Sequence, residues 1–300
     1  MGGGSYNLNT SKLRSSISYQ NVSLDSNISD LKRSGHFSNE LHKELNPSGV
    51  IVRESRDSEE HPNSVAVLLG LDVTGSMGSI PAYMLKEGLN HSIELLFNAG
   101  IKDPQLGIIA LGDVYSDRVP LQISQFESSD ELIDKCLKNI YPEGNGGGNF
   151  GESYNLAWYH AMFHTDIDCY NKRKQKGLLI TMGDEACHAT LPGSIIKLLY
   201  NTSETPKDYT NDELLKLVQE KYVVKHIHIC STSQGSSKSN QDFWKNLLDE
   251  NVIFLEDHTK ISEALNKIIN NYVNTNNVTV ENNTAKSNNS KKEEVVNDWD

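Results

Sequence analysis

Residues 68–76 read Leu-Leu-Gly-Leu-Asp-Val-Thr-Gly-Ser, an apolar run that ends on an aspartate followed by two hydroxyls at alternate positions. With Val-Ala-Val at 65–67, the run before Asp72 holds no polar side chain, which predicts a parallel strand buried on both faces. In open α/β sheets, ligands bind beyond the carboxyl ends of such strands. Asp72, Thr74 and Ser76 therefore offer three oxygens where this architecture carries its chemistry, and oxygen ligands suit a hard cation such as magnesium.

Apolar runs and helical patterns alternate through the rest of the central region. Further buried strands are expected at 106–111, 177–181, 223–230 and 252–255, an edge strand at 119–126, and helices at 81–97, 128–137, 152–164, 210–222, 242–248 and 261–269. Capping-box patterns at 128–131 and 210–213 predict two of the helix starts. This alternation predicts an α/β fold with a doubly wound, mostly parallel sheet and helices on both faces.

The two ends of the chain differ from this central region. Residues 1–62 are rich in serine and asparagine and are expected to form an irregular arm. Residues 274–300 carry asparagine and lysine–glutamate runs and are expected to form a disordered polar tail. A single domain is therefore expected over 63–273.

Composition excludes several classes of function. The 300-residue chain has a formal net charge of -12, which argues against the basic patch of a nucleic-acid-binding protein. No apolar stretch approaches the length of a membrane span, and the first residues lack the apolar core of a secretory signal. The four cysteines have no paired spacing, as is typical of reduced thiols. We therefore expect a cytoplasmic protein with neither nucleic acid nor membrane among its partners.

Three loops of the central region carry acidic and hydroxyl residues. The first is the Asp72-x-Thr74-x-Ser76 motif. The second, at 146–152, reads Gly-Gly-Gly-Asn-Phe-Gly-Glu and leads into an expected helix with Glu152 at its start. The third places Asp184 after a buried strand. Right-handed crossovers bring the ends of neighbouring parallel strands to one edge of the sheet, so Asp72 and Asp184 are expected to meet.

This combination resembles the von Willebrand factor A domain family and its metal-ion-dependent adhesion site. The family's Asp-x-Ser-x-Ser motif is matched by Asp72, Thr74 and Ser76, and its later strand-end aspartate by Asp184. The resemblance covers residues 63–273. It implies a bound magnesium ion, with manganese as the alternative, whose open coordination position accepts a carboxylate from a partner protein.

The middle loop departs from the commoner pattern of the family, in which a threonine is a ligand. Residues 149–153 are more similar to the Asp-x-Pro-Glu segment of integrin β subunits, which supplies a glutamate ligand. The resemblance gives that role to Glu152, while Asn149 and Gly151 replace the aspartate and the proline. The acidic residues of the adjacent inhibitory site of integrins are replaced by Gly78 and Ser79.

The number of charged ligands determines how such a site would bind a partner. Asp72 and Asp184 alone would neutralise a divalent cation, whereas Glu152 as a third ligand would bind it more firmly and make it attract a partner's carboxylate less. Glu152 is therefore expected to be displaced, or to share the ion, when a partner docks. Partner choice is expected to rest on rim loops, namely 231–240 and the residues Asp113, Tyr115, Asp117, Arg118 and Asn149.

Alternative interpretations remain open. Serine and threonine also cap helices, so the first motif is compatible with a helix cap beside a solvated aspartate. A magnesium-dependent phosphohydrolase of the haloacid dehalogenase type also begins with a strand-end aspartate, but Thr74 stands where that class has its acid/base aspartate. A structural or assembly component is a third alternative, with the arm and the tail as docking segments. We expect a non-catalytic, cation-dependent binding module.

Other patterns lack the context that their chemistry needs. The glycine-rich loop at 146–151 fits a dinucleotide fingerprint but follows no strand. His160 and His164 have helical spacing without the glutamate of a zinc protease, and they are expected to be partly buried. Cys187 and His188 follow Asp184 closely, yet no second ligand pair or base accompanies them.

Overall fold

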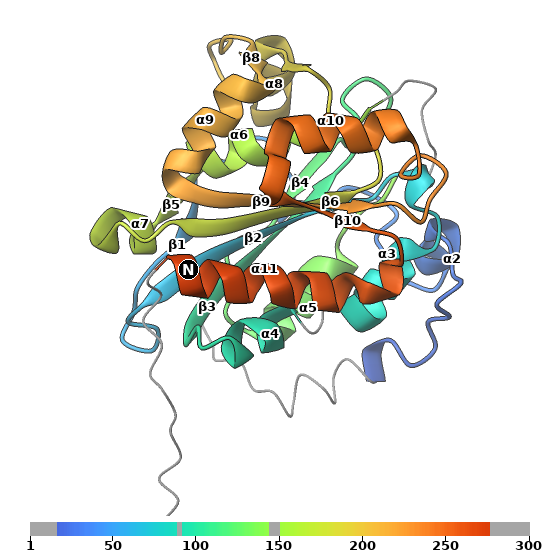
Figure 1. Ribbon diagram of the computed structural model, residues 1–300, viewed down its shortest axis with the longest axis horizontal. Helices are drawn as coiled ribbons and strands as arrows, with labels where there is room; N and C mark the ends of the chain where they lie inside the picture. Colours follow the sequence, from blue (N-terminus) through green and yellow to red (C-terminus); the bar gives the residue numbers. More distant parts are fainter. Residues whose placement is uncertain (1–16, 89–91, 144–150, 277–300) are drawn as a thin grey trace, which may run out of the picture.

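The computed structural model describes residues 17–88, 92–143 and 151–276. Its centre is a six-stranded sheet with the strand order β10-β9-β6-β2-β3-β4 (Figure 1). The strands are β2 (Ser64–Asp72), β3 (Asp103–Leu111), β4 (Leu121–Ile123), β6 (Gly177–Gly183), β9 (Tyr222–Ile229) and β10 (Val252–Leu255). All neighbouring pairs are parallel except β3 with β4, which is antiparallel. The predicted fold class is confirmed.

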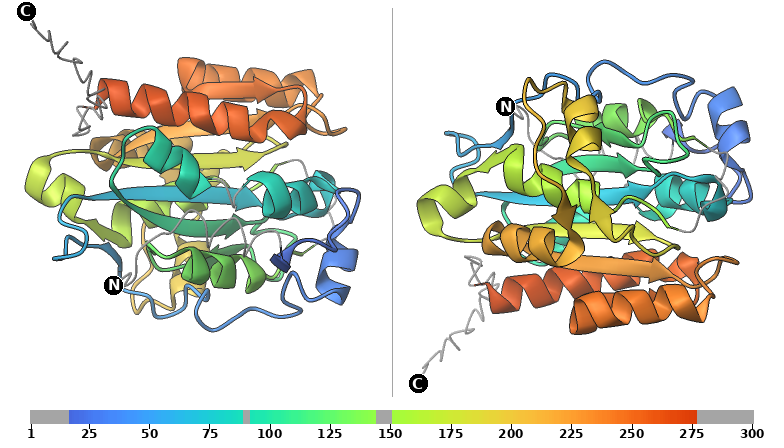
Figure 2. Two further views of the ribbon diagram at one scale, coloured as in Figure 1. Left: turned by 90° about the horizontal axis from the view of Figure 1, so that it is seen from below. Right: turned by 90° about the horizontal axis from the view of Figure 1, so that it is seen from above.

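Helices cover both faces of this sheet (Figures 1 and 2). Side chains alternate along β2, so Val65, Val67 and Leu69 enter one hydrophobic core while Ala66 and Leu68 enter the other. The first core is covered by the helices α2 (Ile28–Arg33), α3 (Ile80–Tyr83), α4 (Ser92–Asn98), α5 (Asp130–Lys138) and α11 (Ile261–Thr275). The second is covered by α6 (Asn155–Phe163), α7 (Asp168–Arg173), α8 (Gly193–Tyr200), α9 (Asn211–Lys221) and α10 (Lys238–Leu248).

Several element boundaries differ from the sequence predictions. The helix expected over 81–97 is divided into α3, a π-helical segment (Met84–Gly88) and α4. Glu152 does not begin a helix, since α6 starts at Asn155 and Glu152 instead forms a parallel bridge with Cys187. The capping box at Thr210 forms with Glu213, whereas the side chain of Ser129 makes no capping bond to α5.

The segment before the first strand of the sheet is mostly without regular structure but packs on the domain. Tyr19, Leu31 and Phe37 are buried in the first hydrophobic core. The Tyr19 hydroxyl donates to Asp134 Oδ1 of α5 at 2.6 Å. These apolar residues have no regular spacing, so no periodic pattern in the sequence indicated that they would enter the core.

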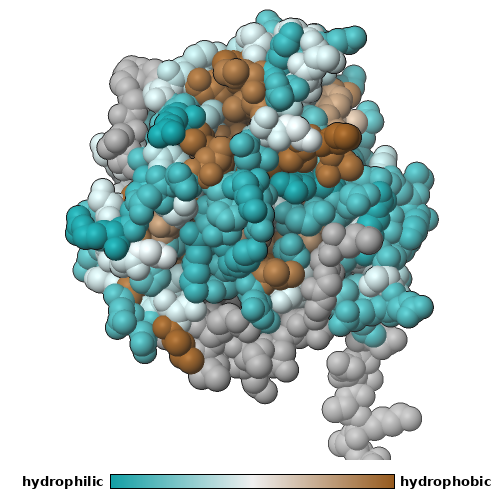
Figure 3. Space-filling model, turned by 180° about the vertical axis from the view of Figure 1, so that it is seen from behind, coloured by the Kyte–Doolittle hydropathy of each residue, from teal (hydrophilic) through white to brown (hydrophobic). Residues whose placement is uncertain are grey.

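The surface is mainly hydrophilic on the face opposite to Figure 1, with hydrophobic residues gathered in its upper part (Figure 3). Exposed large hydrophobic side chains include Leu198 of α8, Ile51 and Phe163. No helix among residues 17–88, 92–143 and 151–276 is long and apolar enough to cross a membrane.

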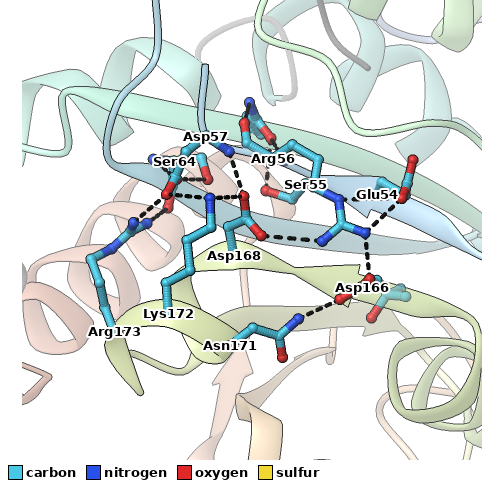
Figure 4. Close-up of polar contacts among 12 residues, drawn as sticks. Glu54, Ser55, Arg56, Asp57, Ser64, Asp166, Asp168, Asn171, Lys172 and Arg173 are labelled. Carbon is cyan, nitrogen blue, oxygen red and sulfur yellow. Dashed lines mark hydrogen bonds and ion pairs between the residues drawn. The ribbon is translucent and has the colours of Figure 1, made fainter. Parts of the chain in front are cut away.

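An ion-pair cluster joins the segment 53–57 to residues 166–173 (Figure 4). It lies at the start of β2, where Ser64 donates to Asp57. There the strand β1 (Arg53–Ser55) pairs in parallel with β5 (Thr165–Ile167). The Arg56 guanidinium contacts Glu54 at 2.6 Å and Asp168 at 3.1 Å, and it also pairs with Asp166. Asp57 accepts from Arg173 at 2.7 Å, which ties the same segment to α7.

Replacing Arg56 by methionine should lower the free energy of unfolding by about 1–2 kcal/mol, because three clustered carboxylates would lose their shared cation. Urea unfolding monitored by circular dichroism measures the change. The control is Arg33→Met, which removes an exposed pair with Asp30 and should shift stability by less than about 0.5 kcal/mol. Equal shifts for the two variants would contradict a clamping role for Arg56.

Candidate metal centre

Two neighbouring parallel strands bring the first and third loops together. In the register of β2 with β6, Leu71 stands opposite Met182, so both strands end at the same edge of the sheet. Asp72 is the last residue of β2, and Asp184 directly follows β6. A short 3₁₀ turn (Gly75–Met77) then carries Ser76 back across the strand ends, where its Oγ donates to Asp184 Oδ1 at 2.9 Å.

The oxygens of this cluster are spaced as ligands of one small cation would be. Thr74 Oγ1 lies 2.6 Å from Asp72 Oδ1 and 3.1 Å from Ser76 Oγ, which in turn lies 2.9 Å from Asp184 Oδ1. Adjacent ligands of an octahedral magnesium ion, each about 2.1 Å from the metal, are about 3.0 Å apart. The donor set of two carboxylates and two hydroxyls therefore fits a hard divalent cation.

The set differs from a site built only of ionisable side chains. Within the described part of the chain, no group of three or more histidine, cysteine, aspartate or glutamate side chains is arranged to hold a metal ion. Hydroxyl oxygens from Thr74 and Ser76 complete the candidate centre instead. Such neutral ligands leave more of the charge of a bound ion uncompensated than carboxylates would.

Glu152 lies in the same buried region, and two hydrogen bonds of its backbone hold it in place. Its N–H donates to the Ala186 carbonyl at 2.8 Å, and its carbonyl accepts from the N–H of His188 at 3.0 Å. The residue is 7% exposed, and its Oε2 has no hydrogen-bond partner among the described residues. A buried carboxylate oxygen without a partner is costly unless a cation satisfies it.

Burial and mutual repulsion disfavour the charged forms of these carboxyls. Burial, followed by the neighbouring Asp184, raises the pKa of Asp72 to about 7. Burial also raises the pKa of Asp184. Burial, then Asp72, Asp117 and Glu185, raises the pKa of Glu152 well above its usual range. Holding these carboxyls together in their charged forms is costly, and a bound divalent cation would lower that cost.

A second layer of acidic residues surrounds Glu152. Asp113 Oδ1 accepts from His188 Nε2 at 2.7 Å, and Glu185 Oε2 accepts from the Gly151 N–H at 2.8 Å. Burial raises the pKa of Asp117 to about 6. These contacts keep the acidic layer ordered around the candidate centre.

The predicted rim residues occupy different depths. Asp113 is only 1% exposed, so it lies beneath the rim rather than on it, contrary to the expectation of a partner contact. Tyr115 is 58% exposed and packs edge-on against the His188 ring at 4.8 Å. Arg118 is exposed and Asp117 half-buried. Asn149 lies outside the described residues.

Two residues at the centre were not assigned a role from the sequence. Tyr154 donates its hydroxyl to Asp72 Oδ2 at 2.6 Å. Thr232 donates to Asp184 Oδ2 at 2.7 Å. Thr232 lies in the serine-rich loop 231–240, which the sequence marked only as rim, whereas nothing in the pattern around Tyr154 distinguished it from core residues of a helix.

The other histidine and cysteine patterns are accounted for by packing. His160 is buried and lies 3.1 Å from the Tyr200 hydroxyl, and His164 stacks on the Tyr200 ring at 3.9 Å. Cys187 is buried, and burial raises the pKa of its thiol to about 12, which disfavours the thiolate that a nucleophile or a zinc ligand requires.

Comparison with known proteins adds structural likeness only. No family model matches the chain, and no curated protein matches it in sequence. Among solved structures, the chain is similar to the pilus adhesin SpaC from Lactobacillus rhamnosus GG in its open conformation, with a TM-score of 0.47 and 11% identity over 75% of this chain and 31% of that one. It is also similar to proximal thread matrix protein 1 from the mussel byssus, with a TM-score of 0.46 and 15% identity over 74% of this chain and 49% of that one. The chain thus spans less than half of either protein, and its fold class is established by its own strand order.

Proposed function

We propose that this chain is a non-catalytic protein-binding module that holds a magnesium ion, or manganese in its place, and uses it to grip a carboxylate of a partner protein. Asp72, Thr74, Ser76 and Asp184 would hold the ion, with Glu152 as a further ligand. The observation that carries the proposal is the chain of side-chain oxygens 2.6–3.1 Å apart at the ends of β2 and β6.

Charge supports a role in gripping an acidic group. When bound, the cation would supply a positive charge that attracts a carboxylate to an otherwise acidic protein of net charge -12. Asp72 and Asp184 together balance the charge of a divalent ion. The affinity of the ion for a third carboxylate therefore depends on whether Glu152 already coordinates it. Glu152 and an incoming carboxylate would therefore compete.

The arrangement around Asp72 also supports a non-catalytic role. The residue two positions after it is Thr74, whose backbone N–H and hydroxyl both donate to Asp72 Oδ1, at 2.9 and 2.6 Å. A phosphohydrolase that uses a strand-end aspartate as nucleophile needs a proton donor for the leaving group. Thr74, tied to Asp72 in this way, has no acidic group to offer.

Magnesium should bind the wild-type chain, and Asp72→Ala should weaken that binding by at least about tenfold, because a charged ligand is lost. Isothermal titration calorimetry with magnesium chloride measures both affinities. The control is Asp168→Ala, which removes a buried carboxylate from the ion-pair cluster at 53–57 and should leave magnesium affinity unchanged. Absence of binding to the wild-type chain would refute the proposed cation site.

Replacing Asp72 by asparagine should stabilise the cation-free protein by about 1–3 kcal/mol at pH 8, because it removes a buried charge. The pKa of Asp72 is raised to about 7 on folding, so the stability contributed by its protonated form is complete below about pH 4 and is lost as the pH rises through 7. The stability difference between Asp72→Asn and wild type should therefore widen from pH 5 to pH 8.

Urea unfolding with a chelator at both pH values measures this difference. Saturating magnesium should then stabilise the wild-type chain at pH 8 but not Asp72→Asn, since only the wild type retains the charged ligand. A wild-type protein that is more stable than Asp72→Asn in chelator at pH 8 would show that the carboxylate is satisfied without a cation.

Glu152→Gln should weaken magnesium binding about tenfold and strengthen capture of a carboxylate by the magnesium-saturated chain. A short polyglutamate peptide is a suitable probe, because the acidic chain repels it unless the cation binds it. Fluorescence anisotropy of the labelled peptide in saturating magnesium gives the second affinity.

Glu127→Gln is the matched control for this variant. Glu127 also has a buried Oε2 without a hydrogen-bond partner among the described residues, and burial raises its pKa, but it pairs with Leu106 at the outer part of the sheet. Its replacement should change neither affinity. Parallel losses of magnesium and peptide binding in Glu152→Gln would show that Glu152 supports partner binding instead of competing with it.

A further inference from the structure

The hydroxyl of Tyr154 contacts the candidate centre from the side opposite to Thr74. Asp72 accepts from the Thr74 hydroxyl and N–H at its Oδ1 and from the Tyr154 hydroxyl, at 2.6 Å, at its Oδ2. Both oxygens of the carboxylate are thus fixed, which sets the rotation of its plane. Tyr154 is completely buried, so water cannot take the place of its hydroxyl.

Gly183 makes this contact sterically feasible. It is the last residue of β6, next to Asp184, and it lacks the side chain that would fill the space above the strand. A Cβ atom at this position would lie 1.9 Å from the Tyr154 hydroxyl oxygen and 2.7 Å from Asp72 Oδ2. Any residue other than glycine would therefore have to separate Tyr154 from Asp72.

The tyrosine ring is held in place by aromatic neighbours on the second core. It packs edge-on against Trp244 of α10 at 5.3 Å and against His226 of β9 at 5.2 Å. Trp244 is itself fixed, because its Nε1 donates to the Glu185 carbonyl at 2.8 Å. With its ring fixed on these sides, the Tyr154 hydroxyl has one direction in which to point, toward Asp72.

We propose that Tyr154 is a positioning residue for cation binding, which orients the Asp72 carboxylate so that Oδ1 lies beside the Thr74 hydroxyl. This inference rests on the proposed function. Tyr154 also follows Glu152 by two residues, so one short segment carries both a candidate ligand and the group that orients another. Removing only the hydroxyl would leave Oδ2 without its donor, so the carboxylate would be restrained by the contacts of Thr74 at Oδ1 and could turn more freely, which weakens a multidentate site.

Tyr154→Phe tests this role, because it keeps the ring and removes the hydroxyl. Calorimetric titration with magnesium chloride should show binding at least about tenfold weaker than in the wild type. The control is Tyr222→Phe: Tyr222 is equally buried, but its hydroxyl lies 2.9 Å from Thr165 Oγ1 at the opposite end of the sheet, and magnesium affinity should be unchanged.

A spectroscopic readout separates positioning from a general loss of structure. The near-ultraviolet circular dichroism of the tryptophan bands should be the same in Tyr154→Phe as in the wild type, because Trp244 and its packing against residue 154 are kept while magnesium binding is weakened. If Tyr154→Phe does not fold, Gly183→Ala is the second variant, since its Cβ would come between the Tyr154 hydroxyl and Asp72 Oδ2 and disrupt their contact from both sides. It should weaken magnesium binding to a similar degree.

The outcomes distinguish this inference from the function on which it rests. Failure of the wild type to bind magnesium overturns the proposed function. Wild-type binding with unchanged affinity in Tyr154→Phe, or in Gly183→Ala where Tyr154→Phe is unfolded, overturns the positioning role alone. Equal weakening in Tyr154→Phe and Tyr222→Phe also overturns it, because the loss would then be structural.

Discussion

The parallel pairing of β2 with β6 is the constraint on which the candidate centre depends. Both strands are buried along their whole length, and their register places Asp72 beside Gly183 and Asp184. A shift of one residue would turn every side chain of β2 to the other face and exchange the two cores. The same packing that stabilises the domain therefore brings the acidic loop ends together.

This placement has a cost that the rest of the domain must offset. Asp72, Asp184 and Glu152 are buried close enough for their charges to oppose one another, and burial raises the pKa of each. Hydrogen bonds from Thr74, Tyr154 and Thr232 compensate part of this cost. Buried carboxyl residues of this kind lower the stability of the domain when no cation is present. Such a cost is expected where a site binds a positively charged ligand.

At the opposite end of the sheet, acidic side chains are paired with basic ones. There Arg56, Lys172 and Arg173 pair with four clustered carboxylates, so each of these carboxylates has a cationic partner within the chain (Figure 4). That cluster fastens the segment before β2 to the helical layer and needs no ligand. At one end of the sheet the carboxylates are paired with cationic side chains, whereas the carboxyls around Asp72 are paired with hydroxyl and N–H groups. This contrast supports the proposal that a cation binds at the carboxyl ends of the strands.

The sequence by itself determined the fold class and the two Asp-bearing strand ends, because buried parallel strands appear as uninterrupted apolar runs and neighbouring strands end at a common edge. Only the tertiary structure decided what surrounds those ends. It placed Glu152 in an extended bridge to Cys187 rather than in a helix, buried Asp113, and brought Tyr154 and Thr232 to the two aspartates. Long-range contacts of this kind depend on how helices pack against the sheet and on the space left by glycine at position 183. Neither produces a periodic pattern in the sequence.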